Sequence, residues 1–318
     1  MKPTRIQIVE HKRSHLQFWE WTYATVLIRN DWGEDSTGFF VGRRVSDIGH
    51  YKIFLVSVKH AIPSEPTPLV MGIHGFIQWP AHQQTLSGWN SLADEYGFIV
   101  VYPQGTGFPL RWNTALMEDK PEGMDKEVQF FSDLIDALSM NYNIDQTRIY
   151  ANGMSNGGGM AHLLACKLSD RIAAIGGVAG AYLHQWEFCQ PKRPVPVIAF
   201  HGTKDPFVPY YGGPTISHRS PYKFGPVEEW AAKWARRNGC EDKRDIIPAI
   251  GKVRGVRYTN CDEDVEVILY SVEGGGHTWP GGDELPRWLV GHTTQEVNAT
   301  ELMWEFFSKY ALKHLTSA

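Results

Sequence analysis

Residues 151–160 read Ala-Asn-Gly-Met-Ser-Asn-Gly-Gly-Gly-Met and place one serine in a G-x-S-x-G pattern. A pattern this short recurs by chance, so its flanks decide its meaning. Residues 148–151 form a short apolar run of strand character, and residues 160–168 have apolar side chains at helical spacing. A serine at a sharp strand-to-helix turn needs glycine neighbours, because the backbone there is strained and side chains would clash. Ser155, at the N-terminus of a helix whose dipole favours negative charge, is therefore the predicted nucleophile.

Two downstream residues have the form that an activated serine requires. A serine hydroxyl is a weak nucleophile at neutral pH, so it needs a base, and the base needs an orienting acid. The strand, turn and helix are typical of the nucleophile elbow of the α/β-hydrolases, in which the acid and then the base follow the serine along the chain. Asp205 follows an apolar strand at 195–200, and His277 lies in a glycine-rich loop after a strand at 265–272. Since catalytic groups of open α/β sheets gather at the carboxyl ends of strands, we expect Ser155, Asp205 and His277 on one rim.

An oxyanion hole completes the predicted site. Residues 68–73 read as an early apolar strand that ends in the sequence His-Gly-Phe. In this fold a backbone N–H from the loop after that strand joins the N–H of the residue after the nucleophile. We therefore assign the two donors to Phe76 and Asn156.

The chain resembles the polyhydroxybutyrate-depolymerase-like and feruloyl-esterase-like branch of the α/β-hydrolases. The matching pieces are Ile73-His74-Gly75, Gly88-Trp89-Asn90-Ser91-Leu92-Ala93-Asp94, Tyr102-Pro103-Gln104, Gly153-Met154-Ser155-Asn156-Gly157-Gly158, His201-Gly202-Thr203-Lys204-Asp205 and Gly275-Gly276-His277-Thr278-Trp279-Pro280-Gly281-Gly282. The resemblance covers roughly residues 50–312 and implies the same triad. It implies that Ser155 attacks an ester carbonyl, that His277 takes the serine proton and later activates water, and that Asp205 orients the imidazole. Family members often carry a cysteine after the first His-Gly, whereas Phe76 stands here, and we expect its ring to reshape the acyl pocket.

Rival acids and bases fit less well. His292 is the rival base, but no clear strand precedes it. Asp283 and Glu273 flank His277 and belong to its own loop, which disfavours them as the acid. Histidines beside glycines at strand ends, or on the helix after the elbow, are interpreted as structural: His74, His162 and His201.

Aromatic residues make up 13% of the chain and include 12 tryptophans, most of which must pack in the core. Trp230 and Trp234 lie four residues apart and are expected to cover one face of a helix. Trp89, Trp112 and Trp279 are predicted as candidates for substrate binding. Trp279 lies two residues after the proposed base, and Trp112 lies in a segment rich in glycine and proline.

The four cysteines, Cys166, Cys189, Cys240 and Cys261, allow three pairings into two disulfides. Free buried thiols are the alternative, and metal binding is disfavoured because no C-x-x-C spacing occurs. The family resemblance favours Cys166–Cys189 and Cys240–Cys261, each joining segments close in sequence. The first bridge would brace the elbow, since Cys166 lies about three turns along the helix behind Ser155. Two disulfides would indicate an oxidising compartment.

Composition and the N-terminal residues limit which partners and locations are expected. The net charge of −4 and the isoelectric point of about 6.4 give no sign of nucleic-acid binding. No run of 18 apolar residues predicts a membrane span. Residues 18–28 are interrupted by Glu20 and rich in aromatics, unlike a signal peptide. We nevertheless expect an extracellular protein, on the strength of the disulfides, with no cofactor, no metal and an ester as its partner; the oligomeric state is left open.

Alternating strands and helices predict an α/β-hydrolase fold with a mostly parallel sheet and helices on both faces. The 318 residues, 42% of them hydrophobic, suffice for one large core. We predict a catalytic domain at residues 37–318, begun by a hairpin of strands at 39–45 and 51–58, with residues 1–36 as an extension of unknown role. Residues 212–226 are expected to contribute to a small lid.

Three function classes stay open. The favoured one is a serine carboxylesterase that hydrolyses aromatic, feruloyl-type or short-acyl esters. Within esterases, the alternatives are a depolymerase of polyhydroxybutyrate or another polyester and an acetylxylan esterase. Outside esterases, a serine peptidase shares the triad order, and a non-catalytic member of the fold is disfavoured because nucleophile, base, acid and oxyanion loops are all present.

Overall fold

The computed structural model describes residues 6–16, 19–29, 35–44, 51–52, 54–57, 65–114, 122–183, 186–215 and 223–313. Its strands are β1 (Ile6–Leu16), β2 (Trp19–Arg29), β3 (Asp35–Arg44), β4 (Tyr51–Lys52), β5 (Phe54–Ser57), β6 (Thr67–Ile73), β7 (Ile99–Pro103), β8 (Ile144–Met154), β9 (Ala174–Val178), β10 (Val197–Gly202), β11 (Gly213–Pro214), β12 (Lys223–Phe224), β13 (Arg244–Ile250), β14 (Val253–Tyr258) and β15 (Val267–Val272). Its helices are α1 (Pro80–Ser87), α2 (Trp89–Tyr96), α3 (Glu122–Asn141), α4 (Asn156–Lys167), α5 (Val227–Arg237), α6 (Arg287–Val290) and α7 (Ala299–Phe307), with short 3-10 turns at Trp186–Phe188 and Asp262–Asp264.

In the described part of the chain, nine strands form the main sheet in the order β13-β14-β15-β10-β9-β8-β6-β7-β5. The inner strands from β15 to β7 run parallel to one another. The outer strands β14, β13 and β5 are antiparallel to their neighbours. The inner strands β6, β7, β9 and β10 are buried along their whole length, as expected for parallel strands covered on both faces.

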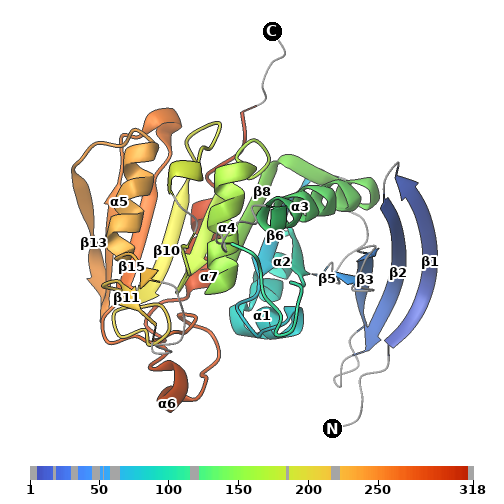
Figure 1. Cartoon of the computed structure of the whole chain (residues 1–318), viewed down its shortest axis with the longest axis horizontal. Coiled ribbons are helices and arrows are strands. Elements are labelled where there is room, and N and C mark those ends of the chain that lie inside the picture. The colour runs from blue at the N-terminus through green and yellow to red at the C-terminus, as the bar shows by residue number, and fades with distance from the viewer. Residues whose placement is uncertain are drawn as a thin grey trace.

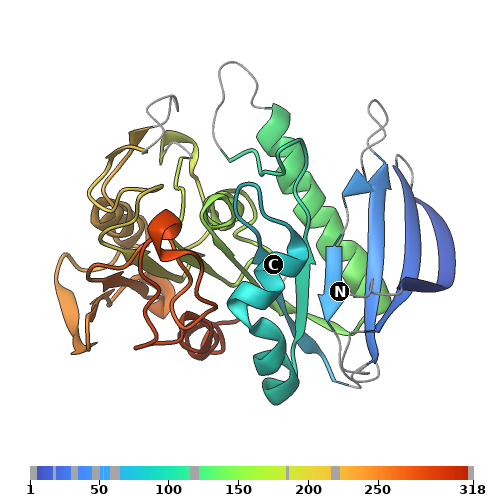
Figure 2. The ribbon, with the colours of Figure 1, turned by 90° about the horizontal axis from the view of Figure 1, so that it is seen from below.

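Helices cover both faces of this sheet and form two hydrophobic cores (Figures 1 and 2). On one face α3, α4 and α5 pack over side chains of the central strands. On the other face α1, α2 and α7 enclose a second cluster around Trp89 and Phe307. The structure is therefore the predicted α/β-hydrolase fold, with the parallel strands ending at a common rim. None of the described helices is both long enough and apolar enough to cross a membrane.

The N-terminal strands differ from the prediction. Among the described residues, β1 to β4 form a separate antiparallel sheet, drawn in blue in Figure 1. The predicted pairing of these two segments is confirmed, since β3 and β4 are antiparallel neighbours. Its predicted place at the start of the main sheet is wrong, because the β3–β4 pair belongs to the separate sheet and only β5 joins the main one. The N-terminal sheet lies against the main sheet through contacts between β3 and β5. The ends of the predicted hairpin strands, at residues 45 and 58, lie outside the described residues.

Two smaller features concern a break between two helices and the predicted lid segment. Residues 80–96 form two helices in place of one, because Gly88 adopts a left-handed conformation with φ of 66° between α1 and α2. In the predicted lid segment, β11 and β12 pair as a short antiparallel ribbon. Residues 216–222 of that segment lie outside the described residues. The prediction that a lid is formed there stays a prediction.

Candidate active site

Ser155 stands at a strained turn between β8 and α4. Its φ of 55° and ψ of −118° lie in a region that residues other than glycine rarely occupy. The turn is fixed on both sides, since the Ser155 N–H donates to the Val178 carbonyl at 2.9 Å and its own carbonyl accepts from Gly159 and Ala181. This is the backbone geometry that the G-x-S-x-G pattern predicts.

The glycine requirement at the turn comes from the neighbouring strand. A Cβ on Gly157 would collide with the carbonyl oxygens of Ile73 and His74, at the end of β6. Both obstacles are backbone atoms and cannot rotate away. Gly157 therefore lets the start of α4 approach the loop after β6, which brings the predicted oxyanion loop against the elbow.

Asp205 and His277 meet at the same rim. Asp205 follows β10 and His277 follows β15, and both strands run parallel to β8 in the sheet. The His277 Nδ1–H donates to Asp205 Oδ2 at 2.7 Å, between side chains that are 10% and 0% exposed. Within the described residues, His277 Nε2 has no hydrogen-bond partner. This arrangement leaves the outer imidazole nitrogen free to accept a proton.

A glycine also permits the approach of these two loops. A Cβ on Gly202, the last residue of β10, would collide with the backbone of Gly275 and Gly276. The Lys204 N–H donates to the Gly275 carbonyl at 2.9 Å. The glycine-rich sequence before His277 therefore allows direct backbone packing against the loop that carries Asp205.

The Asp205 carboxylate is held in an ionised state. Burial alone would raise its pKa, but the charge of His277 and hydrogen bonds from His201 and His277 outweigh burial and hold the pKa well below its usual range. Its other oxygen, Oδ1, accepts the backbone N–H groups of Phe207 and Val208, each at 2.8 Å. A buried carboxylate so anchored can orient His277 and stabilise its charged form.

His201 is a second histidine on the same carboxylate, which the sequence analysis took as structural only. Its Nε2 lies 2.9 Å from the Val208 carbonyl and 3.3 Å from Asp205 Oδ2. The signal for this contact was its position, four residues before Asp205 across a tight turn. His201 therefore holds the loop of Asp205 at the same carboxylate oxygen that His277 contacts.

The loop after β6 is held by side chains that the sequence analysis did not single out. Gln78 Oε1 accepts the Gly75 N–H at 2.8 Å. His74 accepts the Gly105 N–H at its Nε2 at 2.9 Å, and its Nδ1 lies 2.8 Å from the Gly75 carbonyl. Burial is the main reason that the pKa of His74 falls to about 4, so the ring is neutral near pH 7 and can accept from Gly105.

Phe76 and Asn156, the predicted oxyanion donors, lie in the loop after β6 and at the first residue of α4. Considering the described residues alone, the backbone N–H of neither one has a hydrogen-bond acceptor. The Asn156 side chain is occupied, since it bonds to the Trp112 N–H at 2.7 Å and the Trp112 carbonyl at 3.0 Å. Two backbone donors are therefore left facing no protein acceptor beside the elbow.

The three tryptophans predicted to bind substrate are buried, and the structure corrects this prediction. Trp89 and Trp279 are 0% exposed and Trp112 is 2% exposed. Each indole N–H is satisfied internally: Trp89 by Asn152, Trp112 by the His74 carbonyl and Trp279 by Thr300. Rings so enclosed offer no face to a ligand, so their role is to support the loops around the site.

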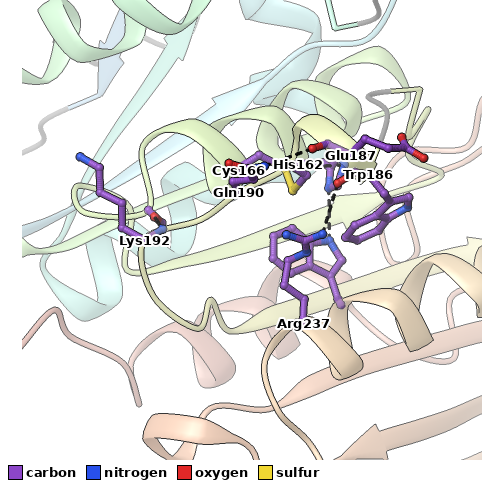
Figure 3. The surroundings of a disulfide bond; sticks show 10 residues. His162, Cys166, Trp186, Glu187, Gln190, Lys192 and Arg237 are labelled. Atoms are coloured by element: carbon purple, nitrogen blue, oxygen red, sulfur yellow. Dashed lines mark hydrogen bonds between the residues drawn. A yellow bond between two sulfur atoms is a disulfide. The ribbon is translucent and has the colours of Figure 1, made fainter.

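The predicted disulfides Cys166–Cys189 and Cys240–Cys261 are confirmed. The first joins α4 to the segment after β9, in the surroundings shown in Figure 3. There the guanidinium of Arg237 lies 5.5 Å from the centre of the Trp186 ring and donates to the Trp186 carbonyl at 3.2 Å. The bridge therefore braces the helix that begins at the nucleophile, as the sequence analysis anticipated.

Comparisons with known proteins agree with this geometry. Residues 51–187 match the family model described as esterase PHB depolymerase. Over these residues the chain is similar to this esterase family, and its fold is that of the α/β-hydrolases.

Individual relatives are also named as esterases. The chain is 29% identical over 266 residues to a putative esterase, NocK, of Nocardia uniformis subsp. tsuyamanensis, covering 78% of this chain and 77% of that protein. It is 32% identical over 223 residues to feruloyl esterase B of Piromyces equi, covering 66% of this chain but only 39% of that longer protein. An acetyl xylan esterase from Aspergillus awamori has the same fold, with a TM-score of 0.54 and 15% identity over 81% of this chain and 94% of that one.

Proposed function

We propose that this esterase is a serine carboxylesterase that cleaves aromatic, feruloyl-type or short-acyl esters through Ser155, His277 and Asp205. The observation that carries the proposal is the hydrogen bond from His277 Nδ1 to Asp205 Oδ2, at the rim where Ser155 occupies its strained turn. A histidine anchored at Nδ1 presents Nε2 as the base. The N–H groups of Phe76 and Asn156, which meet no acceptor among the described residues, supply the second requirement, a place for the oxyanion.

The reaction follows from these groups in order. His277 Nε2 takes the hydroxyl proton of Ser155 as the oxygen attacks the ester carbonyl. The N–H groups of Phe76 and Asn156 stabilise the tetrahedral oxyanion, and Asp205 stabilises the imidazolium. The imidazolium returns its proton to the leaving alcohol, and an acyl-enzyme remains. Water then attacks the acyl-enzyme with the same histidine as base, which releases the acid.

The preference for aromatic or short acyl groups rests on the similarity to feruloyl esterase B and on the family model. A polyester depolymerase of the polyhydroxybutyrate type and an acetylxylan esterase use the same carbonyl chemistry. The two disulfides favour an extracellular location.

A rate panel tests the proposal. We expect hydrolysis of methyl ferulate and p-nitrophenyl acetate by the native protein and a loss of at least about 10⁴-fold in kcat for Ser155→Ala. Ser91→Ala, at an exposed serine on α2, is the matched control and should keep the native rate. If Ser155→Ala hydrolyses these esters at the native rate, or a fluorophosphonate fails to label the native protein, the proposal is wrong. Clearing of a polyhydroxybutyrate film with poor ferulate turnover would move the substrate to polyesters.

A further inference from the structure

A short segment at residues 105–112 is hydrogen-bonded to both elements that carry the proposed oxyanion donors. It follows β7, and we call it the bridging segment. Two backbone bonds between Thr106 and Arg111, each 3.1 Å long, hold its two arms together. None of its residues takes part in the catalytic steps above.

The Asn156 side chain ties the bridging segment to the nucleophile helix. Asn156 is the first residue of α4, directly after Ser155, and its backbone N–H is one of the two proposed donors. Its Oδ1 accepts the backbone N–H of Trp112 at 2.7 Å, and its Nδ2 donates to the Trp112 carbonyl at 3.0 Å. A longer contact of 3.4 Å joins Nδ2 to the hydroxyl of Thr114. One amide therefore binds both backbone groups of Trp112, as a paired strand residue would, and fixes the place of Trp112 relative to Ser155.

The bridging segment also holds the loop after β6, which carries the other proposed donor, Phe76. The Trp112 indole N–H donates to the His74 carbonyl at 3.0 Å. On the other side of Phe76, the Ile77 N–H donates to the Leu110 carbonyl at 2.9 Å. The segment therefore grips the loop both before and after the donor.

A further bond from the segment fixes the direction of the Phe76 N–H. Burial lowers the pKa of His74 to about 4, so the ring is neutral near pH 7. Its Nε2 accepts the Gly105 N–H at 2.9 Å, so the ring proton is on Nδ1, which donates to the Gly75 carbonyl at 2.8 Å. That carbonyl and the Phe76 N–H belong to one planar trans peptide and point in opposite directions. Holding the carbonyl therefore aims the N–H.

Trp112, the residue shared by both sides of this link, is itself fixed by packing. Trp112 is 2% exposed and His74 is 0% exposed. The indole lies against two rings of α3, with centroid distances of 6.3 Å to Phe130 and 5.2 Å to Phe131. The link from α4 to the loop after β6 thus passes through a buried ring that has little room to move.

We infer that Asn156 and Trp112 are positioning residues that set the spacing of the two oxyanion donors through the bridging segment. The inference rests on the proposed function and deepens it, because it gives the Asn156 side chain a role separate from that of its backbone N–H. Gly157 lets α4 and the loop after β6 approach each other, and the link then fixes how the two N–H groups lie. Both can bind one oxyanion only at the right spacing, and a misplacement of about 1 Å can cost about 10²-fold in rate.

Two variants break the link on either side of Trp112 without removing a backbone donor. Asn156→Ala loses both bonds to the Trp112 backbone, and Trp112→Phe keeps a ring but loses the bond to His74. We expect each to lower kcat for p-nitrophenyl acetate about ten- to hundredfold, with KM within about twofold of native, because acylation and deacylation both pass through an oxyanion and the bound ester has none. A trifluoromethyl ketone, whose adduct with Ser155 carries that oxyanion, should bind more weakly by the same factor.

The double variant and two controls separate this effect from a general loss of packing. Asn156→Ala combined with Trp112→Phe should lose no more than the worse single variant, because both changes break one link. Asn90→Ala on α2 removes a bond of 2.8 Å to the Tyr102 hydroxyl, and Trp304→Phe alters a tryptophan on α7, both on the sheet face opposite α4. These controls should keep kcat and ketone affinity within about twofold of native. Melting curves verify the fold, and the half-buried Asn156 side chain gives the milder of the two changes.

The outcomes separate the inference from the proposed function. Native kcat and native ketone affinity in either folded variant would overturn the link and leave the esterase standing. A lower kcat with unchanged ketone affinity would also overturn it, because the side chain would then act elsewhere than on the oxyanion, and additive losses in the double variant would show two separate effects in place of one link. Ester hydrolysis that survives Ser155→Ala would instead refute the proposed function. Matching, non-additive losses of kcat and ketone affinity support the inference.

Discussion

Replacing Asp205 with asparagine changes the proton position on the proposed base while keeping the size of the side chain. Oδ1 accepts two backbone N–H groups at 2.8 Å, from Phe207 and Val208, and Oδ2 accepts the His277 Nδ1–H at 2.7 Å. In Asp205→Asn the amide oxygen can keep the two backbone bonds, which turns the NH₂ group toward His277. The imidazole must then accept at Nδ1 and carry its proton on Nε2. That tautomer cannot take the proton of Ser155.

We expect kcat to fall about 10⁴-fold, the loss seen when a triad histidine is held in the wrong tautomer, which corresponds to about 5.5 kcal/mol of transition-state stabilisation. The assay is steady-state hydrolysis of p-nitrophenyl acetate near neutral pH, with circular dichroism and a melting curve to verify the fold. Asp283→Asn, at an exposed aspartate in the loop of His277, is the matched control and should stay within twofold of the native rate. A drop of less than tenfold in folded Asp205→Asn would refute this role for Asp205.

Three further predictions concern the supports of the site. Gly157→Ala should lower kcat by about 10²–10³-fold, because its Cβ would push the loop after β6 away from the elbow, whereas Gly225→Ala meets no atom and should leave ester hydrolysis unchanged. His74 is expected to make the free energy of unfolding depend on pH, because its pKa is about 4 in the folded protein and 6.5 in the unfolded chain. Between these values the unfolded chain binds more protons, so stability falls as the pH drops from 6.5 to 4. The total loss is about 3 kcal/mol, and urea unfolding at pH 7 and pH 4.5 should show a steeper fall for the native protein than for His74→Gln; equal slopes would contradict it. Removing the first disulfide by the paired change Cys166→Ala and Cys189→Ala should cost about 3 kcal/mol of unfolding free energy, as a closed loop of this length predicts, and urea midpoints within error of native would count against it.

The parts of the site that are local in sequence could be predicted. The elbow needs one strand, two glycines and one helix within about 20 residues, and the strained φ of Ser155 agrees with that reading. The meeting of Asp205 and His277 is not local, but parallel strands place their carboxyl ends at one rim, so chain order was sufficient. The hydrogen bond between the two side chains is the consequence of that topology.

The orientation of side chains and the pairing of antiparallel strands could not be predicted from chain order. Trp279 lies two residues from His277, yet its ring turns inward to Thr300. Sequence distance from the base says nothing about which side of the loop a ring occupies. The N-terminal sheet was missed for a related reason, since a strand pattern at β3 does not reveal whether its partner is β2 or the main sheet. Pairing depends on contacts distant in the chain, which periodicity does not encode.

The loop that carries Asp205 holds the catalytic carboxylate and also lines a cavity of about 120 Å³. Asp205 Oδ1 binds the N–H of Val208, and the carbonyl of the same residue lies 2.9 Å from His201 Nε2. Asp205 and His201 therefore fix both backbone polar groups of Val208. The Val208 side of the cavity faces residues of α5, among them Trp230. A change in that wall made at Val208 would disturb the carboxylate that orients His277. Among the hydrogen bonds of the described residues, none joins α5 to Ser155, Asp205 or His277. We therefore expect a substitution at Trp230 on α5 to disturb the chemical step less than a substitution at Val208, in the loop that carries the acid.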